Sequence, residues 1–366
     1  MLIGGGVVAF GAAGATAFGL SRMGSMTDYT AAVAKARATL PDHPEPRDLV
    51  RYATLAASGH NTQPWRFHIE EGRITIQPDF SRRTPAVDPD DHHLFTSMGC
   101  AAENLAIAAA ERGRNGELTF DPEGSGSVAF EFKAAQPEHS ILFEAIPRRQ
   151  STRADYDGRS VDSGDLSALT AAARTPGVDL ILVTDRRQIE RVLELVIAGN
   201  ATQMADPAFV RELKGWLRFN PRQALETGDG LFGASTGNPI APAWLGNLLF
   251  DLVFRVTAEN DKYAKQVRSS AGVAVFVSER DDKDHWMRAG RACQRFALQA
   301  TALGLKHAFI NQPVEVAALR PDLARLIGLP GRRPDIVMRF GYGSAMPFSA
   351  RRPVSAVVSS MPTHSG

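Results

Sequence analysis

The stretch Ser58-Gly-His-Asn-Thr-Gln-Pro-Trp65 decides how this chain is interpreted. It places polar side chains in a glycine-containing turn, and Pro64 and Trp65 then lead into a strand, because the residue before a proline favours extended backbone. Amide side chains and backbone N–H groups in such a turn can hydrogen-bond the rim of a flat heterocycle. The alternative is an ordinary turn followed by a core tryptophan.

A second stretch, Arg149-Gln-Ser-Thr-Arg153, begins 91 positions after Ser58. The segment from Ile141 onward indicates a helix that ends in a turn and presents Arg149, Ser151 and Arg153 together. Arginine forks bind phosphate and carbonyl oxygens bidentately, so this cluster suits a phosphate and a carbonyl-rich ring. Taken alone, the same residues equally describe a solvated basic turn.

Together the two motifs resemble the FMN site of the nitroreductase superfamily, in which the Arg-x-Ser-x-Arg piece comes first and the Asn-x-Gln-Pro-Trp piece later. Here the order is reversed. In homodimers of that family the two pieces at one flavin come from different subunits. The chain therefore resembles the duplicated, single-chain Acg-like branch. That resemblance implies an α+β fold with a central mixed or antiparallel sheet sandwiched by helices, duplicated as an internal pseudo-dimer with a lid-like insertion.

Two later segments extend the resemblance. Leu303 to Pro313 is similar to the family's loop that faces the flavin N5 edge, and Arg351-Arg352-Pro353 is similar to its closing phosphate-binding arginine. The resemblance implies cofactor contacts from Arg149, Gln150, Ser151, Arg153, Ser58, Gly59, His60, Asn61, Gln63, Phe309, Ile310, Asn311, Gln312, Arg351 and Arg352.

The activity implied by the resemblance is hydride transfer from NAD(P)H through FMN to a nitroaromatic, quinone or related acceptor. Since the cofactor carries this chemistry, no catalytic side chain is expected. No glycine-rich dinucleotide fingerprint is present, so NAD(P)H would bind transiently over the flavin. Two alternatives stay open: a lidded protein that sequesters flavin with little or no turnover, and a remnant that binds no flavin.

An internal repeat supports two halves. Gly99 and Gly113 bracket an alanine-rich helical pattern, and Gly290 and Gly304 bracket a similar one 191 positions later. Short strand patterns flank both helices at 73–77, 128–132, 180–183 and 273–277, which predicts sheets covered by helices on both faces. We divide the chain into a hydrophobic segment 1–25, a first half 26–138 and a second half 139–366 with an insertion at about 206–261. Each half supplies only one of the two motifs, so one complete site is expected.

The composition limits the classes of partner that the protein is expected to bind. A formal charge of +1 gives no electrostatic footprint for nucleic acid or an anionic membrane, so we expect a small-molecule electron acceptor and no stable protein partner. A monomeric pseudo-dimer or a weak homodimer is expected. Cys100 and Cys293 are predicted to be buried free thiols. The pair His92-His93 is predicted to be a solvated loop, and no metal site is expected.

The first twenty residues indicate a targeting segment. Leu2 to Leu20 is an uncharged run rich in glycine and alanine. It is typical of a signal-peptide core, and Leu-Ile-Gly-Gly-Gly resembles the stretch after the arginine pair in twin-arginine signals, with Met1 then an internal start. We expect export to the periplasm, with a membrane anchor or a cytoplasmic protein as alternatives.

Overall fold

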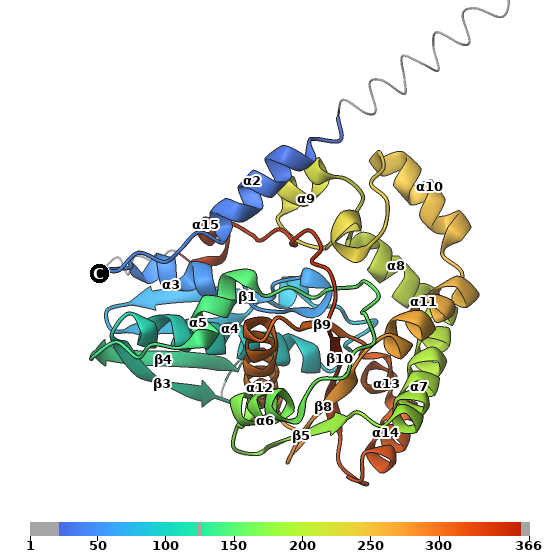
Figure 1. The fold of residues 1–366 in the computed structure, drawn as a ribbon. Helices are drawn as coiled ribbons and strands as arrows, with labels where there is room; N and C mark the ends of the chain where they lie inside the picture. Colours follow the sequence, from blue (N-terminus) through green and yellow to red (C-terminus); the bar gives the residue numbers. More distant parts are fainter. Residues whose placement is uncertain (1–21, 123, 125, 360–366) are drawn as a thin grey trace, which may run out of the picture.

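The computed structural model describes residues 22–122, 124 and 126–359, so the predicted targeting segment lies almost entirely outside the described residues. Two separate four-stranded antiparallel sheets form the framework, one from each half of the chain (Figure 1). The first, in the order β1-β2-β4-β3, comprises Trp65–Glu70, Arg73–Pro78, Ser127–Ala134 and Arg114–Asp121. The second, in the order β5-β8-β10-β9, comprises Val178–Val183, Gly272–Ser278, Pro334–Gly341 and Lys306–Phe309.

Fourteen α-helices are described outside the sheets. They are α2 (Met26–Ala36), α3 (Pro46–Ala53), α4 (His92–Glu111), α5 (Ile141–Ala145), α6 (Ser163–Ala173), α7 (Arg186–Ala205), α8 (Pro207–Gly215), α9 (Pro221–Thr227), α10 (Ala243–Val253), α11 (Val256–Arg268), α12 (Lys283–Ala302), α13 (Gln312–Glu315), α14 (Arg320–Leu326) and α15 (Val354–Val357). A short parallel pair, β6 (Leu217–Arg218) and β7 (Leu231–Phe232), lies between α8 and α10 in the chain. The α+β class is confirmed.

The two sheets differ in how they are covered. Strand β8 is buried along its whole length, with Phe276 facing the cluster around α12 and Val275 facing the cluster around α7. In the first sheet, Ile74 and Ile76 face the core, whereas Arg73 pairs with Glu131 on an exposed face. The prediction of helices on both faces was therefore wrong for the first half. Alternating apolar and polar residues leave one face of an antiparallel sheet in water.

The predicted repeat helices correspond to α4 and α12, which have equal lengths and begin 191 positions apart. They cross at their glycines. A β-carbon on Gly99 would lie 2.0 Å from the carbonyl oxygen of Met287, and one on Gly290 would lie 2.0 Å from that of Thr96. Because Thr96 and Met287 are themselves 191 positions apart, the contact is reciprocal.

Polar pairs repeat this reciprocity further along the helices. Arg295 Nη1 lies 2.8 Å from Glu103 Oε1, and Gln294 Nε2 donates to Asn104 Oδ1 at 2.8 Å. Positions 103 and 104 correspond to 294 and 295 under the same offset. Charge and hydrogen bonding therefore fix the register of the two helices in addition to their close approach.

The halves also exchange segments. Leu142 and Phe143 of α5 belong to the core of the first half, although they follow the predicted boundary at residue 138. At the other end of the chain, Val358 forms a parallel bridge with Phe67, and Ser359 N donates to Phe67 O at 2.9 Å. The boundary stays a prediction, and the two halves are interlocked around α4 and α12.

We expect Gly99→Ala and Gly290→Ala each to destabilise the protein by about 3 kcal/mol, because the added methyl group would meet a backbone oxygen that cannot move aside. Urea unfolding followed by circular dichroism measures this. Gly215→Ala is the control, since the added carbon would meet no atom of another described segment within 4 Å. A change of less than about 0.5 kcal/mol is expected there. Equal stabilities for all three variants would contradict the close crossing.

Candidate functional site

A cavity of about 530 Å³ lies where the two halves and the insertion meet. Its volume is within the usual range for small-molecule sites. The first half contributes the Ser58 turn and the beginning of α4, and the second half contributes Arg153 and the loop after β9. The residues of these segments that line it are Ala57, Ser58, Gly59, His60, His93, Thr96, Ser97, Cys100, Arg153, Phe309, Asn311 and Gln312.

The Ser58–Trp65 turn is held in a strained conformation. His60, Asn61 and Gln63 have φ angles of 46°, 56° and 53°, in the left-handed region that side chains with a β-carbon rarely adopt. Among the described residues, only Asp91 shares this property without being glycine. Such strain persists where surrounding contacts over-determine the backbone, and it concentrates at functional sites.

The side-chain amides of this turn hydrogen-bond neighbouring segments of the chain and do not face the cavity. Asn61 Nδ2 donates to Gly230 O at 3.1 Å, and Gln63 Nε2 donates to Gly228 O at 2.8 Å, so the turn binds the insertion. On their acceptor sides, Asn61 Oδ1 and Gln63 Oε1 accept from Arg351 Nη1 and Arg352 N, both at 2.9 Å. Neither Asn61 nor Gln63 lines the cavity, and their hydrogen bonds tie the turn to the insertion and to the C-terminal arginines. Their contacts with a cofactor ring stay a prediction.

His60 and Arg153 both line the cavity and interact electrostatically. Burial, followed by the charge of Arg153, lowers the pKa of His60 to about 4, so the imidazole is neutral at pH 7. Its Nδ1 has no hydrogen-bond partner within the part of the chain that the structure describes. Burial also lowers the pKa of Arg153, and no carboxylate of the described residues forms an ion pair with it. The pair presents a neutral ring and an uncompensated cation to whatever occupies the cavity.

The loop after β9 forms another wall. Asn311 Oδ1 accepts from Val337 N at 2.9 Å, and Ile310 N donates to Val337 O at 2.9 Å, which ties the loop to β10. Ile310 is buried in the core and does not line the cavity. Gln312 is buried, and no described residue hydrogen-bonds its Oε1. A β-carbon on Gly199 would lie 2.7 Å from the Gln312 β-carbon, so α7 presses the loop into place.

The arginine motif divides between two environments. Of its residues, Arg153 alone reaches the cavity wall. Gln150 makes a pair of hydrogen bonds to the backbone of Met346, each 2.8 Å long, and Ser151 forms a bridge with His307. Arg149 Nη2 donates to Leu55 O at 2.9 Å. Of the predicted cofactor residues, those outside the cavity wall are Arg149, Gln150, Ser151, Asn61, Gln63, Ile310, Arg351 and Arg352.

Arg149 and Arg351 nevertheless lie directly behind the cavity wall. Arg351 Nε donates to Thr54 O at 2.8 Å, and its Nη2 donates to Leu55 O and Ala56 O at 3.3 and 3.2 Å. These carbonyls follow α3 and immediately precede Ala57, which lines the cavity. Burial, and then the charge of Arg149, lowers the pKa of Arg351 to about 9.

The insertion roofs the cavity. The roof is anchored by Asp229, whose carboxylate contacts Arg82 of the first half and accepts from Arg218 Nη2 at 2.6 Å. Phe250 of α10 and Phe254, the residue that follows this helix, line the cavity. Trp244 on the same helix is 62% exposed. The sequence predicted a lid-like insertion at about 206–261, and residues of this segment do line the cavity. Helix α11 begins at Val256, inside the predicted range.

A cluster of titratable side chains lies at the α13 side of the cavity. The sequence patterns did not predict it. Glu315 Oε2 accepts from Gln203 Nε2 at 2.6 Å, and Glu315 Oε1 lies 3.7 Å from His93 Nε2. Burial raises the pKa of Glu315 to about 7 against the opposing hydrogen bond from Gln203. Burial, and then His92, lowers the pKa of His93 well below its usual value.

The histidine pair corrects one prediction. His92 and His93 begin α4, and His92 is buried with its Nε2 2.9 Å from Asp335 Oδ1, so the expectation of a solvated loop was wrong. The signal that could have found them is Asp88-Pro-Asp-Asp91, whose Asp91 is the N-cap of α4. No group of three or more metal-ligating side chains occurs within 22–122, 124 and 126–359. Both cysteines are buried and free, as predicted.

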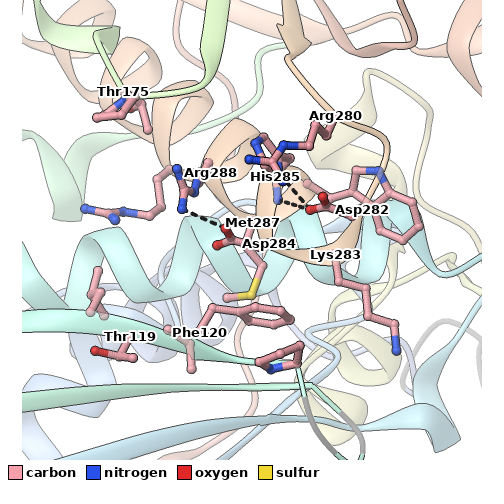
Figure 2. Close-up of a pocket in the computed structure, with 16 residues that line it drawn as sticks. Thr119, Phe120, Thr175, Arg280, Asp282, Lys283, Asp284, His285, Met287 and Arg288 are labelled. Carbon is pink, nitrogen blue, oxygen red and sulfur yellow. Dashed lines mark hydrogen bonds and ion pairs between the residues drawn. The ribbon is translucent and has the colours of Figure 1, made fainter.

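A second hollow, of about 980 Å³, lies against the beginning of α12 (Figure 2). Its α12 residues stand 191 positions after α4 residues that line the first cavity: Asp284, Met287, Arg288 and Arg291 follow His93, Thr96, Ser97 and Cys100. Five of its side chains form three ion pairs: Arg288 Nη2 with Asp284 at 2.7 Å, His285 Nδ1 with Asp282 at 2.7 Å, and Arg291 Nε with Glu103 at 2.8 Å. Although it is larger, this hollow lacks the strained turn and the Arg153 cation of the first cavity.

Glu315→Gln tests the cluster through the pH dependence of stability. A carboxyl group whose pKa is raised on folding holds its proton longer in the folded state, so its contribution to stability falls as pH rises from about 4.5 to about 7. Glutamine cannot ionise. We therefore expect the variant to gain roughly 2 to 3 kcal/mol relative to the native protein between pH 4.5 and pH 8 in urea unfolding.

Glu194→Gln on α7 is the matched control because Glu194 is exposed, and it should keep the native pH profile. If the stabilities of Glu315→Gln and of the native protein changed with pH in parallel, Glu315 would ionise equally in the folded and the unfolded state. That result would contradict the prediction.

Comparison with known proteins identifies the family to which this chain belongs. The profile of the nitroreductase family matches residues 146–344, which is more than half of the chain. "Putative NAD(P)H nitroreductase Rv3131" of Mycobacterium tuberculosis H37Rv is 27% identical over 333 residues, covering 87% of this chain and 92% of that protein. "Putative NAD(P)H nitroreductase acg" of the same strain is 24% identical, covering 85% and 94%.

Among solved structures, a nitroreductase with bound FMN from Desulfitobacterium hafniense has 14% identity and a TM-score of 0.38, covering 59% of this chain and 96% of that chain. The FMN-dependent nitroreductase NfnB from Mycobacterium smegmatis, in complex with NADPH, has 15% identity and a TM-score of 0.36, covering 56% and 88%. On the match to the family profile, this chain belongs to the nitroreductase family and is an oxidoreductase.

Proposed function

We propose that this protein is an FMN-dependent oxidoreductase that takes electrons from NAD(P)H and delivers them to a nitroaromatic, quinone or related small-molecule acceptor. The observation that carries the proposal is the cavity built from both halves, lined by the Ser58–His60 turn of the first half and by Arg153 and Gln312 of the second. The two Mycobacterium tuberculosis relatives carry names that describe them as NAD(P)H nitroreductases.

The polar groups of the cavity fit a flavin ring. Gln312 Oε1, His60 Nδ1 and Thr96 Oγ1 are buried without hydrogen-bond partners among the described residues, and each such atom is costly unless a ligand or water satisfies it. A flavin ring carries donors and acceptors along one edge of an otherwise flat apolar surface. The apolar roof of α10 suits its face, and the cation of Arg153 suits its electron-rich oxygen and nitrogen atoms.

Each group has a separate task in this arrangement. FMN, when bound, supplies the hydride and electron transfer. Arg153 would stabilise negative charge at the ring edge, and the Phe309–Gln312 loop would orient the ring through its main chain. Glu315 can hold or release a proton at its carboxylate near neutral pH, within reach of an acceptor under the roof. Arg149 and Arg351 would hold the phosphate from behind the wall.

The competing proposal is a lidded protein that sequesters flavin. It is favoured by the anchoring of the roof, which is held by Asp229 and by hydrogen bonds from Asn61 and Gln63. A roof fixed at so many points would restrict the approach of a nucleotide to the ring.

We infer further that the chain arose by duplication and functions as a monomeric pseudo-dimer or a weak homodimer. The equal lengths of α4 and α12 and their reciprocal contacts at one offset support this. The paired charges of the second hollow support the idea that only one site is retained.

We also propose export through a twin-arginine-like signal, with a membrane anchor or cytoplasmic location as the alternatives. Within the described part of the chain, no helix is long and apolar enough to cross a membrane. Cell fractionation with N-terminal sequencing tests export, and an uncleaved cytoplasmic protein would contradict it.

Flavin reduction separates the candidates. We expect the purified protein to show FMN absorbance, and the band to bleach anaerobically on addition of NADH or NADPH. Bleaching by dithionite alone would contradict the oxidoreductase proposal and favour sequestration. A colourless protein that takes up no added FMN would contradict both.

The phosphate assignment makes a second prediction. Arg149→Ala and Arg351→Ala should each weaken FMN binding by about 1.5 to 3 kcal/mol, the usual range for a hydrogen bond to a charged group. Fluorescence titration of deflavinated protein measures the affinity. Arg148→Ala is the control, because Arg148 is the exposed neighbour of Arg149 in the same turn. Unchanged affinity in both test variants would remove the assignment.

A further inference from the structure

Helix α10 exposes large apolar side chains on the outside of the roof. Figure 1 shows this helix at the periphery of the molecule, away from both sheets. Trp244, Leu248 and Leu252 follow one another at intervals of four residues, which places them on one face of the helix, and they are 62%, 50% and 55% exposed. We call this the outer face of α10. Large apolar side chains that gather on an exposed face mark an interaction surface.

The apolar surface of α10 continues from its outer face into the cavity. Leu249, Phe250 and Val253 belong to the cavity wall, although Leu249 and Val253 are also 38% and 62% exposed. The polar side chains of this helix are Asn247 and Asp251 alone. An apolar molecule that passes from the outside of α10 into the cavity therefore stays in contact with apolar side chains.

Contacts on its other sides fix the orientation of α10. A β-carbon on Gly246 would lie 2.3 Å from Phe219 Cγ, so the helix packs directly on that ring. Lys214 Nζ of α8 donates to both carboxylate oxygens of Asp251 at 2.8 Å. Neither contact involves the outer face, which is the side of the helix that these contacts turn outward.

The outer face is too small to hold a second protein molecule by itself. A helix of eleven residues is about 16 Å long and about 10 Å wide, so one face offers about 160 Å². A stable protein interface buries about 800 Å² on each partner. A membrane surface has no such minimum, because a single helix with an apolar face and a tryptophan can lie at the boundary between headgroups and acyl chains.

The N-terminal run of the chain reaches the described residues at the roof. Met23 O accepts from Arg222 N of α9 at 2.8 Å, and α9 and α10 lie at the same end of the molecule in Figure 1. The preceding sequence contains the uncharged run from Leu2 to Leu20. If this run anchors the protein, as one of the alternatives above has it, the roof and α10 are on the membrane side.

We propose that the outer face of α10 docks on a lipid membrane and that the electron acceptor is a lipid-soluble quinone, which enters the cavity from that membrane along α10. The proposal rests on the proposed function, and it narrows the class of acceptor that the function leaves open. A quinone with an isoprenoid tail suits both kinds of wall. Its tail matches Leu249, Phe250 and Val253, and its carbonyl groups match Gln203 and Glu315.

The reaction balances with groups already described. Reduction of a quinone to a quinol adds one hydride and one proton. In the proposed function the hydride comes from NAD(P)H by way of FMN, which leaves NAD(P)⁺. Burial raises the pKa of Glu315 to about 7, so its carboxyl group can supply the proton and recover it from water afterwards.

Tryptophan quenching locates the docking face. Full-length native protein is mixed with neutral phosphatidylcholine vesicles whose acyl chains carry bromine, which quenches tryptophan on contact. We expect the native emission to be quenched, and Trp244→Phe to lose most of that quenching while it still floats with the vesicles. Because both proteins carry the N-terminal run, lipid binding by that run does not produce the difference. Native emission that is not quenched, or equal quenching in the variant, would contradict docking through α10.

The acceptor test compares one methylated naphthoquinone with and without an isoprenoid tail. FMN-loaded protein is reduced with dithionite, so that the result does not depend on the nucleotide, and its reoxidation is followed anaerobically in the presence of vesicles. The test variant combines Trp244→Ser, Leu248→Ser and Leu252→Ser, and none of these residues lines the cavity. We expect it to lose about tenfold in rate with the tailed quinone and to keep the native rate with the tailless one.

Ile141→Ser is the matched control, because Ile141 is an apolar side chain that is 57% exposed on α5. It should keep the native rate with both quinones. The inference would be overturned by equal rates for the native protein and the test variant with the tailed quinone. It would also be overturned if the tailless quinone or a nitroaromatic reoxidised the protein and the tailed quinone did not.

A second copy of the chain is the other occupant that the experiment distinguishes. Native dimers that the test variant no longer forms would assign the outer face to that copy and overturn membrane docking. A protein that binds no FMN, or that neither the quinones nor a nitroaromatic reoxidise, would instead reject the proposed function.

Discussion

The close crossing of α4 and α12 is the constraint on which the rest of the structure depends. At this crossing, Gly99 and Gly290 leave no room for a side chain, and each helix presses on a backbone oxygen of the other. The beginning of α4 contributes His93, Thr96 and Cys100 to the cavity wall, so the crossing sets where that wall stands. Two polar pairs, Glu103 with Arg295 and Gln294 with Asn104, prevent the helices from sliding.

The strained Ser58–Trp65 turn connects this framework to the insertion and to the C-terminal arginines. Its amides bind the insertion on one side and Arg351 and Arg352 on the other. A single short segment therefore fixes the cavity wall, the roof and the C-terminal arginines together. Three left-handed residues in that turn are tolerated because several separate chain segments meet there.

Sequence patterns predicted where the strands lie better than they predicted what covers the faces of the sheets. The alternation in 73–77 and the apolar run 273–277 predicted β2 and β8, because strand periodicity is a local property. The same alternation is typical of a half-exposed sheet, so the expectation of helices on both faces holds only for the second sheet. Ser58 and Arg153, which the motifs singled out, both line the cavity, and each belongs to a motif that is contiguous in the chain.

The surroundings of Arg37, His93 and Glu315 could not be predicted from sequence. Each depends on approach between segments more than one hundred residues apart: Arg37 to Arg149, and His93 to Glu315. Nothing in the sequence around Arg37 distinguishes it from arginines that stay exposed. Its burial beside Arg149 is created only by the folded arrangement.

We propose that two interlocked halves build one flavin site per chain. Native mass spectrometry of protein reconstituted with excess FMN tests it most directly, because it reports mass and stoichiometry together. We expect one FMN bound to each chain, including in the monomer. Two flavins per chain, or flavin bound only in dimers, would contradict it.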